Sequence, residues 1–193
     1  RDYYASRGLG DVYKRQVDGT TITFWHSMGG VNGEAMDYLV NKFNEENTDS
    51  ITVEAVYQGE YDDTINKLKS AQIGNMGADL VQVYEIGTRF MIDSGWIVPM
   101  QQMIDADSYD VSEIEPNLAA YYTIDNELYS MPFNSSTPIL YYNKDMFEKA
   151  GITEVPTSLE GILAIGDDLK TKGGAGEPLA LSIYGWYFEQ WLC

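Results

Sequence analysis

The sequence predicts an α/β fold built on a parallel sheet, and two observations support this prediction. Between residues 21 and 84, short runs with strand periodicity alternate with longer runs with helical periodicity, in the order strand, helix, strand, helix, strand. The last of these runs, Leu80 to Tyr84, is almost continuously apolar, which is typical of a strand buried on both faces. Strands that alternate with helices run parallel, so this order indicates a sheet covered by helices.

The first three elements each have a local signal. Polar and apolar side chains alternate from Thr21 to Phe24 and predict the first strand. Asn32 is expected to cap the helix that follows. The apolar face of that helix is predicted to consist of Ala35, Leu39, Val40 and Phe43. A second alternation, from Ile51 to Ala55, predicts the next strand.

The second helix is expected to begin at Glu60, just before the third strand of the series. Asp62 and Asp63 fall in its first turn, where negative charge interacts favourably with the helix dipole. Its apolar face is predicted to consist of Tyr61, Ile65 and Leu68.

The second part of the chain begins with a segment, from Gly95 and Pro99 to about Pro116, that is expected to be irregular and acidic. A hairpin is predicted at 122–129, with its turn at Asp125 and Asn126. Further elements are expected in this order: a strand at 139–142, a helix capped by Asn143 and closed by Gly151, a helix opened by a Thr157–Glu160 capping box, and a strand at 179–183. This run restarts a strand-helix-helix-strand unit, as if a second lobe begins.

The organisation along the chain follows from these signals. Residues 1–16 contain four of the 12 basic residues and show no periodicity, so we expect a non-native or disordered tail. Residues 17–136 are predicted to form an α/β lobe, and 137–193 the crossing into a second lobe and its beginning. An apolar run at the end, from Trp186 to Leu192, indicates an unfinished element, so we expect the sequence to be truncated at both ends.

Composition excludes several classes of function. With 12 basic and 30 acidic residues the formal net charge is −18, which argues against nucleic acid or anionic lipid as a partner. Cys193 is the single cysteine and His26 the single histidine, so a transition-metal site is not expected. No nucleophile motif is present, and we predict that the chain is not an enzyme and needs no cofactor. For His26, a polar residue lining a cleft is favoured over a general base.

A binding site is expected where the parallel strands end. Ligands of such sheets lie beyond the carboxyl ends of the strands. These ends are Trp25-His26-Ser27, Tyr57-Gln58-Gly59 and Tyr84-Glu85.

Four stretches that carry these elements resemble a known family: TITFWHSM, VYQGEYDDTINKL, DLVQVYEIGTRFMIDSG and MPFNSSTPILYYNKDMFEKAG. Together they are similar to family 1 of the extracellular solute-binding proteins of ABC transporters. The resemblance implies a class II periplasmic-binding-protein-like fold, of which this chain supplies one nearly complete lobe and the start of a second. It implies a monomeric protein, periplasmic or extracellular and in one alternative lipid-anchored, that delivers a small polar ligand to ABC permease subunits.

The resemblance also implies a ligand and its contacts. On the branch with the greatest similarity the ligand is sn-glycerol-3-phosphate or a glycerophosphodiester. The family's ligand-binding residues correspond here to Tyr61, Glu85, Ser136 and Trp186. Trp25, His26 and Ser135 are expected to line the cleft, and a phosphate-binding arginine is expected from a part that this sequence does not contain.

Two alternatives stay open at this point. Ile183 stands where the family has the first member of an aromatic pair, which keeps a sugar or oligosaccharide as an alternative ligand. A secreted hydrolase that uses Glu85 and a nearby aspartate is the alternative from another class of function.

Overall fold

The computed structural model describes residues 19–74 and 76–192. The chain divides into two compact units, Arg1–Met131 (unit 1) and Pro132–Cys193 (unit 2), and each is described by itself. The predicted tail at 1–16 lies outside the described residues, and the predicted lobes, 17–136 and 137–193, stay predictions.

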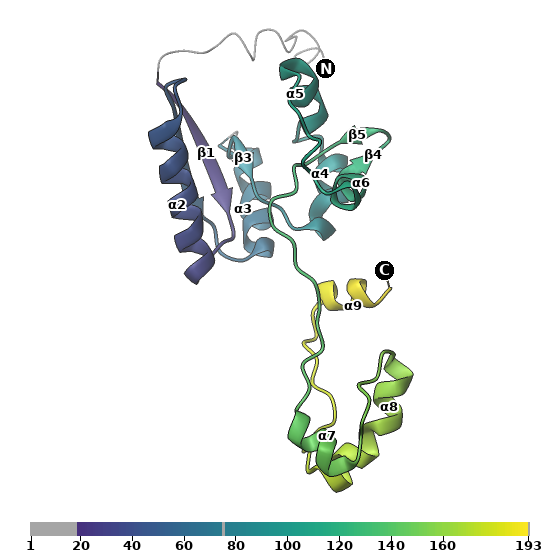
Figure 1. Ribbon diagram of the computed structural model, residues 1–193. Coiled ribbons are helices and arrows are strands. Elements are labelled where there is room, and N and C mark those ends of the chain that lie inside the picture. The colour runs from purple at the N-terminus through teal and green to yellow at the C-terminus, as the bar shows by residue number, and fades with distance from the viewer. Residues whose placement is uncertain (1–18, 75, 193) are drawn as a thin grey trace. The chain divides into compact units, whose positions relative to one another are not determined.

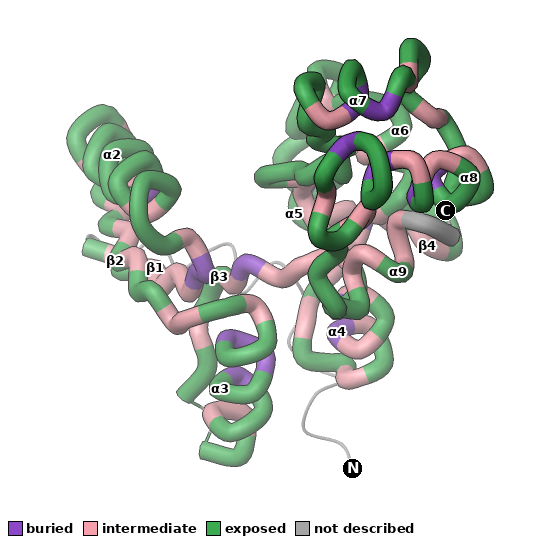
Figure 2. Tube along the Cα trace, turned by 90° about the horizontal axis from the view of Figure 1, so that it is seen from below, coloured by how far each residue is buried: buried purple, intermediate pink, exposed green. Residues whose placement is uncertain are grey.

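Unit 1 is built on a sheet of three parallel strands in the order β2-β1-β3. The strands are β1 (Thr20–His26), β2 (Ile51–Tyr57) and β3 (Leu80–Val81). β1 and β2 pair along their whole length, from Thr20 opposite Ile51 to His26 opposite Tyr57. Helices α2 (Gly30–Glu46) and α3 (Tyr61–Ile73) cover opposite faces of this sheet (Figures 1 and 2). The predicted α/β arrangement is therefore confirmed for unit 1.

The third strand is shorter than predicted. Only Leu80 and Val81 pair with β1, opposite Phe24 and Trp25. The side chain of Asp79 accepts a hydrogen bond from the Thr23 amide at 2.9 Å, so a carboxylate takes the place of a further strand residue. A few residues after Val81 the chain forms a helical turn at Glu85–Gly87.

Helix α2 packs on the sheet through a different face from the one predicted. Met36 is its buried residue, whereas Leu39 and Phe43 are exposed. The reason is polar: Asn44 donates to the carbonyl of Val53 (2.9 Å) and accepts from its amide (2.7 Å). Asn47 makes the same pair of bonds to Ile51 at 2.9 and 3.1 Å. Asn32 does not cap the helix, because Gly29 occupies the N-cap position.

Helix α3 follows its prediction closely. Ile65 and Leu68 are buried, and Glu60 is the N-cap residue of a capping box with Asp63. Figure 2 shows buried positions along this helix. Thr64, which is completely buried, completes the inward face that periodicity alone assigned to apolar residues.

The remainder of unit 1 is more helical than predicted. Its elements are η1 (Glu85–Gly87), α4 (Thr88–Ser94), α5 (Met100–Asp107), α6 (Pro116–Tyr122), β4 (Thr123–Ile124) and β5 (Glu127–Leu128). The expectation of an irregular segment between Gly95 and Pro116 was wrong, because α5 forms there and buries Ile104. The predicted hairpin is confirmed: β4 and β5 pair antiparallel, and Asp125 and Asn126 have the positive φ values that its turn requires.

Unit 2 contains α7 (Lys144–Ala150), α8 (Leu159–Asp168), the π-helical turn η2 (Leu169–Gly173) and α9 (Gly185–Leu192). Phe147, Ala150 and Leu169 form its buried core. Asn143 caps α7 by accepting from the Met146 amide at 3.1 Å, as predicted, and Gly151 closes that helix with φ 72°. The predicted Thr157–Glu160 capping box was wrong, because Ser158 caps α8 instead.

Two predicted strands of unit 2 are not formed. Segments 139–142 and 179–183 pair with no strand among the described residues. Periodicity indicates an extended, partly apolar segment, but a strand also needs a neighbour to share its backbone hydrogen bonds. Ile139, Tyr141 and Ile183 are accordingly exposed.

Candidate functional site

The carboxyl ends of the three parallel strands lie side by side in unit 1. The amide of Gln58, just after β2, donates to the carbonyl of His26 at 2.9 Å. The amide of Gln82, just after β3, donates to the carbonyl of Trp25 at the same distance. The loops that follow the strands therefore begin at one edge of the sheet, which is where a parallel sheet holds its ligands.

Tyr61 and the residues before Glu85 meet at this edge. The ring of Tyr61, the first residue of α3, stacks on the ring of Tyr84 with centroids 5.4 Å apart and planes 2° from parallel. The Tyr84 hydroxyl donates to the Asp62 carboxylate at 2.5 Å, which fixes the second ring relative to α3. Glu85 follows directly and opens η1. The structure thus brings Tyr61 next to the Tyr84–Glu85 pair.

The turn that carries Glu85 is packed tightly against α3. Gly87 is buried, and a Cβ atom there would lie 2.7 Å from Val83 Cγ1 and 3.0 Å from Ile65 Cδ1. No larger residue fits without displacing these side chains. The close approach holds η1, and with it Glu85, in one place relative to the helix.

His26 is buried rather than open to solvent, with 3% of its surface exposed. Its ring lies 5.8 Å from that of Phe24 and 5.9 Å from that of Tyr57, and its Nδ1 accepts from the Met28 amide at 3.3 Å. Burial lowers the pKa of His26 below its ordinary value, and the negative charge of Asp37 opposes this only in part. The side chain is therefore a neutral hydrogen-bond acceptor near neutral pH. Trp25 is half-buried.

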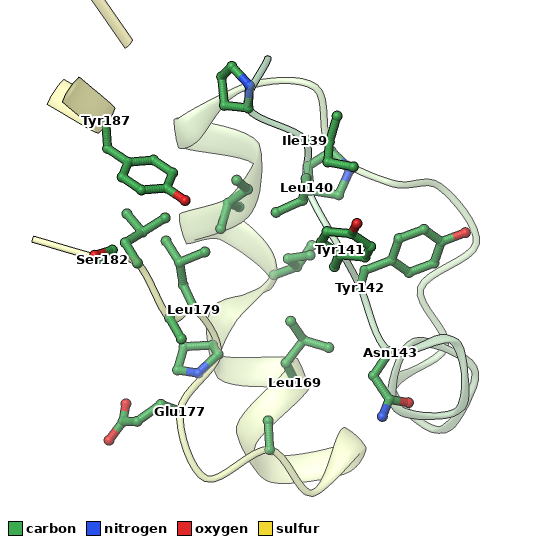
Figure 3. Close-up of a pocket in the computed structure, with 18 of the residues that line it drawn as sticks. Ile139, Leu140, Tyr141, Tyr142, Asn143, Leu169, Glu177, Leu179, Ser182 and Tyr187 are labelled. Atoms are coloured by element: carbon green, nitrogen blue, oxygen red, sulfur yellow. The ribbon is translucent and has the colours of Figure 1, made fainter. Parts of the chain in front are cut away.

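The other predicted contacts belong to unit 2. Ser136 and Trp186 both line a pocket of about 640 Å³, whereas Ser135 does not line it. The pocket lies between segments 136–143 and 177–182, and Figure 3 shows Leu140, Leu169 and Leu179 on its walls. Its lining is mostly apolar, and Ser136 is one of its polar residues, beside Thr137, Asn143, Glu177 and Ser182.

The described residues show no transmembrane helix and no metal cluster. None of their helices is long and apolar enough to span a bilayer. No group of three His, Cys, Asp or Glu side chains among them is placed to hold a metal ion.

Sequence reasoning missed several polar residues at the edge of the sheet. Ser27, Thr64 and Gln82 are buried there and bonded to one another, and Tyr84 carries the stack on Tyr61. Thr64 had a usable signal, because it lies three residues after Tyr61 and therefore on the same face of the helix. Gln82 had one as well, since a polar residue within an apolar strand needs a buried partner.

Known proteins of one family are similar to this chain in sequence. A family described as bacterial extracellular solute-binding protein matches residues 38–192. The sn-glycerol-3-phosphate-binding periplasmic protein UgpB of Salmonella typhimurium (strain LT2) is 45% identical over 138 residues, which are 69% of this chain and 31% of that protein. UgpB of Escherichia coli (strain K12) is 38% identical over 161 residues, 80% of this chain and 36% of that protein. The chain thus spans about a third of these relatives' length.

Solved structures show the same fold. UgpB from Mycobacterium tuberculosis, in complex with glycerophosphocholine, has a TM-score of 0.69 at 25% identity, covering 78% of this chain and 38% of that one. The cyclic α-maltosyl-1,6-maltose binding protein from Arthrobacter globiformis has a TM-score of 0.62 at 21% identity, covering 81% and 39%. These similarities confirm the predicted fold class.

Proposed function

Because the chain belongs to the bacterial extracellular solute-binding proteins, we propose that it helps to capture sn-glycerol-3-phosphate, or a glycerophosphodiester, for an ABC importer. Relatives with the glycerol phosphate in their name support this choice of ligand. On this proposal the protein acts as a monomer outside the cytoplasmic membrane and hands its ligand to permease subunits. The relatives are transport proteins, so the ligand is expected to leave chemically unchanged.

The observation that carries the proposal is the placement of Tyr61 beside Tyr84 and Glu85. A glycerol phosphate presents hydroxyl donors at one end and anionic oxygens at the other. The Glu85 carboxylate can accept from the hydroxyls, and the Tyr61 hydroxyl can donate to a phosphate oxygen. The stack on Tyr84 limits the motion of the Tyr61 ring, so little rotational freedom is lost on binding.

The remaining contacts are proposed to come from elsewhere in a longer protein. Ser136 is expected to donate a hydrogen bond, and Trp186 to pack against the glycerol carbons. A phosphate also needs a cation, because the chain carries a net charge of −18. We propose that an arginine outside this sequence supplies it.

Calorimetry on a full-length protein that contains this chain tests the proposal. The wild type is expected to bind sn-glycerol-3-phosphate, and Tyr61→Phe is expected to weaken binding roughly tenfold or more, as for a lost hydrogen bond to a charged group. Glu85→Ala is expected to weaken binding of sn-glycerol-3-phosphate and of glycerophosphocholine alike. Tyr38→Phe is the matched control, since Tyr38 is 64% exposed on α2.

A neutral sugar is the second candidate ligand, because Ile183 departs from the pattern that the resemblance implies for glycerol phosphate. This residue replaces an aromatic side chain expected by resemblance, and it is fully exposed. Titration with a maltooligosaccharide, in parallel with sn-glycerol-3-phosphate, distinguishes the two candidate ligands. Binding of the sugar without binding of either glycerol phosphate would overturn the first choice.

A further inference from the structure

Three uncharged polar side chains are buried together beneath the candidate site. Ser27 and Gln82 are each 7% exposed, and Thr64 is 0% exposed. They come from three separate segments: the loop after β1, helix α3, and the chain just after β3. Polar groups buried in a small core destabilise the fold unless they are bonded, so the partners of each group matter.

The hydrogen bonds of this cluster run outward from Ser27, toward Thr64 on one side and toward Gln82 on the other. Thr64 Oγ1 lies 3.2 Å from the carbonyl of Glu60 and must donate to it, because a carbonyl oxygen only accepts. A hydroxyl has a single proton, so the 2.7 Å contact between Thr64 and Ser27 must be a donation from Ser27 Oγ. The amide of Ser27 in turn donates to Gln82 Oε1 at 3.0 Å. Each of the three segments is thereby tied to the next.

Both candidate ligand contacts of unit 1 are attached to this cluster. The carbonyl of Glu60, where the chain of donors ends, belongs to the residue directly before Tyr61. Gln82 lies three residues before Glu85, and the intervening Tyr84 stacks on Tyr61. A shift at Thr64 would therefore move the start of α3 and the segment before η1 relative to each other.

We propose that Thr64, with Ser27 and Gln82, is a positioning residue that fixes the distance between Tyr61 and Glu85 for the ligand. This inference rests on the proposed function, since it names how that same site is preorganised. A well-packed valine can replace a threonine with little change in shape. Thr64→Val would leave the Ser27 hydroxyl without its acceptor and detach the loop after β1 from α3.

The experiment uses a full-length protein with Thr64→Val, Thr64→Ser and Thr171→Val. Thr171 is the matched control, because its hydroxyl also donates to a carbonyl four residues earlier (Asp167, 2.7 Å) but on the surface of unit 2. Affinity for sn-glycerol-3-phosphate is measured well below the melting temperature, and amide hydrogen exchange is followed at residues 27, 63 and 64. Ser27→Ala is a milder second variant, because it leaves the Thr64–Glu60 bond in place.

Thr64→Val is expected to weaken affinity about fivefold or more and to speed exchange at these amides. Thr64→Ser, which keeps the hydroxyl, should restore both, and Thr171→Val should change neither. If Thr64→Val does not fold, Ser27→Ala is expected to show the same pair of effects.

Two results would overturn the inference. One is a Thr64→Val protein that melts at a lower temperature but binds and exchanges locally as the wild type does, since the cluster then serves stability alone. The other is unchanged exchange at residues 27, 63 and 64. A wild type that binds neither glycerol phosphate would instead remove the proposed function and, with it, the ligand role of the cluster, whatever the exchange data show.

Discussion

At the scale of single residues, His26 is the group whose surroundings change its chemistry most clearly. The sequence has no other histidine, so a histidine titration in this chain by itself has one source. Its Nδ1 accepts the Met28 amide, and a proton added there would replace that attraction with repulsion. Burial also disfavours the protonated form, and it lowers the pKa of His26 below 6.5.

The lowered pKa predicts how stability depends on pH. Well above pH 6.5 the imidazole is neutral in both the folded and the unfolded chain, and the contribution of this residue is fully present. Below it the unfolded chain binds the proton more readily, so the free energy of unfolding falls until the pH reaches the lowered pKa of the folded state. Urea unfolding between roughly pH 7.5 and 5.5 should show this loss.

His26→Asn is the comparison for that measurement, because the amide oxygen of asparagine can accept from the Met28 amide without titrating. The variant is expected to lose less stability than the wild type over the same pH interval. An equal loss in both proteins would show that His26 is not its source.

At the scale of elements, the junction between β2 and α3 controls where Tyr61 lies. Gly59 has φ +99°, and a Cβ atom there would lie 2.7 Å from Asp63 Oδ2. The same Asp63 carboxylate oxygen accepts from the Glu60 amide at 3.1 Å and so closes the capping box of α3. The turn, the cap and the first residue of the helix are therefore coupled.

Gly59→Ala is expected to destabilise the protein by about 1–3 kcal/mol, because alanine is strained at this φ and its methyl group displaces the cap. Chemical denaturation measures the effect. Gly176→Ala is the control: that glycine has no positive φ and no atom within 4 Å of an added Cβ. If both variants were equally stable, the coupling of turn and cap would be absent.

The elements also show how far sequence reasoning reaches. Periodicity predicted β1, β2 and α3. Side-chain burial alternates along β2, and α3 buries Ile65 and Leu68 on its predicted face. For α2 it predicted the helix but not the face that packs on the sheet. Asn44 and the C-cap residue Asn47 bond to β2, and a search for apolar side chains does not detect asparagines. Segment 139–142 has strand composition but pairs with no strand in the part of the chain that the structure describes, and no local pattern can reveal this.

For the candidate site, strand order predicted which side chains lie at one edge of the sheet, but not the contacts that hold them there. Tyr61 and Glu85 could be placed at that edge because parallel strands end together. The Tyr84–Asp62 bond and the Thr64 cluster link residues from different segments. Such contacts depend on the distance between elements, which the sequence alone does not contain.

At the scale of the whole molecule, charge is the dominant feature. The 30 acidic residues outnumber the 12 basic ones, so repulsion opposes folding at low ionic strength. Three exposed ion pairs join described residues: Arg89–Asp93, Lys170–Glu177 and Lys172–Asp168. Exposed pairs of this kind contribute at most about 1 kcal/mol each.

Added salt is therefore expected to stabilise the protein. Raising NaCl from about 10 to about 150 mM shortens the Debye length from about 30 to about 8 Å and screens the excess negative charge. A rise in melting temperature of about a few degrees, which levels off at higher salt, should be seen by calorimetry. A fall would mean that the ion pairs outweigh the repulsion.

The asparagine bonds at the end of α2 determine which edge of the sheet another strand can join. Asn44 and Asn47 occupy the outward amides and carbonyls of Val53 and Ile51, so an incoming strand finds β2 already satisfied there. Two copies of this chain are thereby kept from joining edge to edge along those residues. Extension of the sheet by another strand is therefore favoured past β3, the flank that leads directly to Glu85.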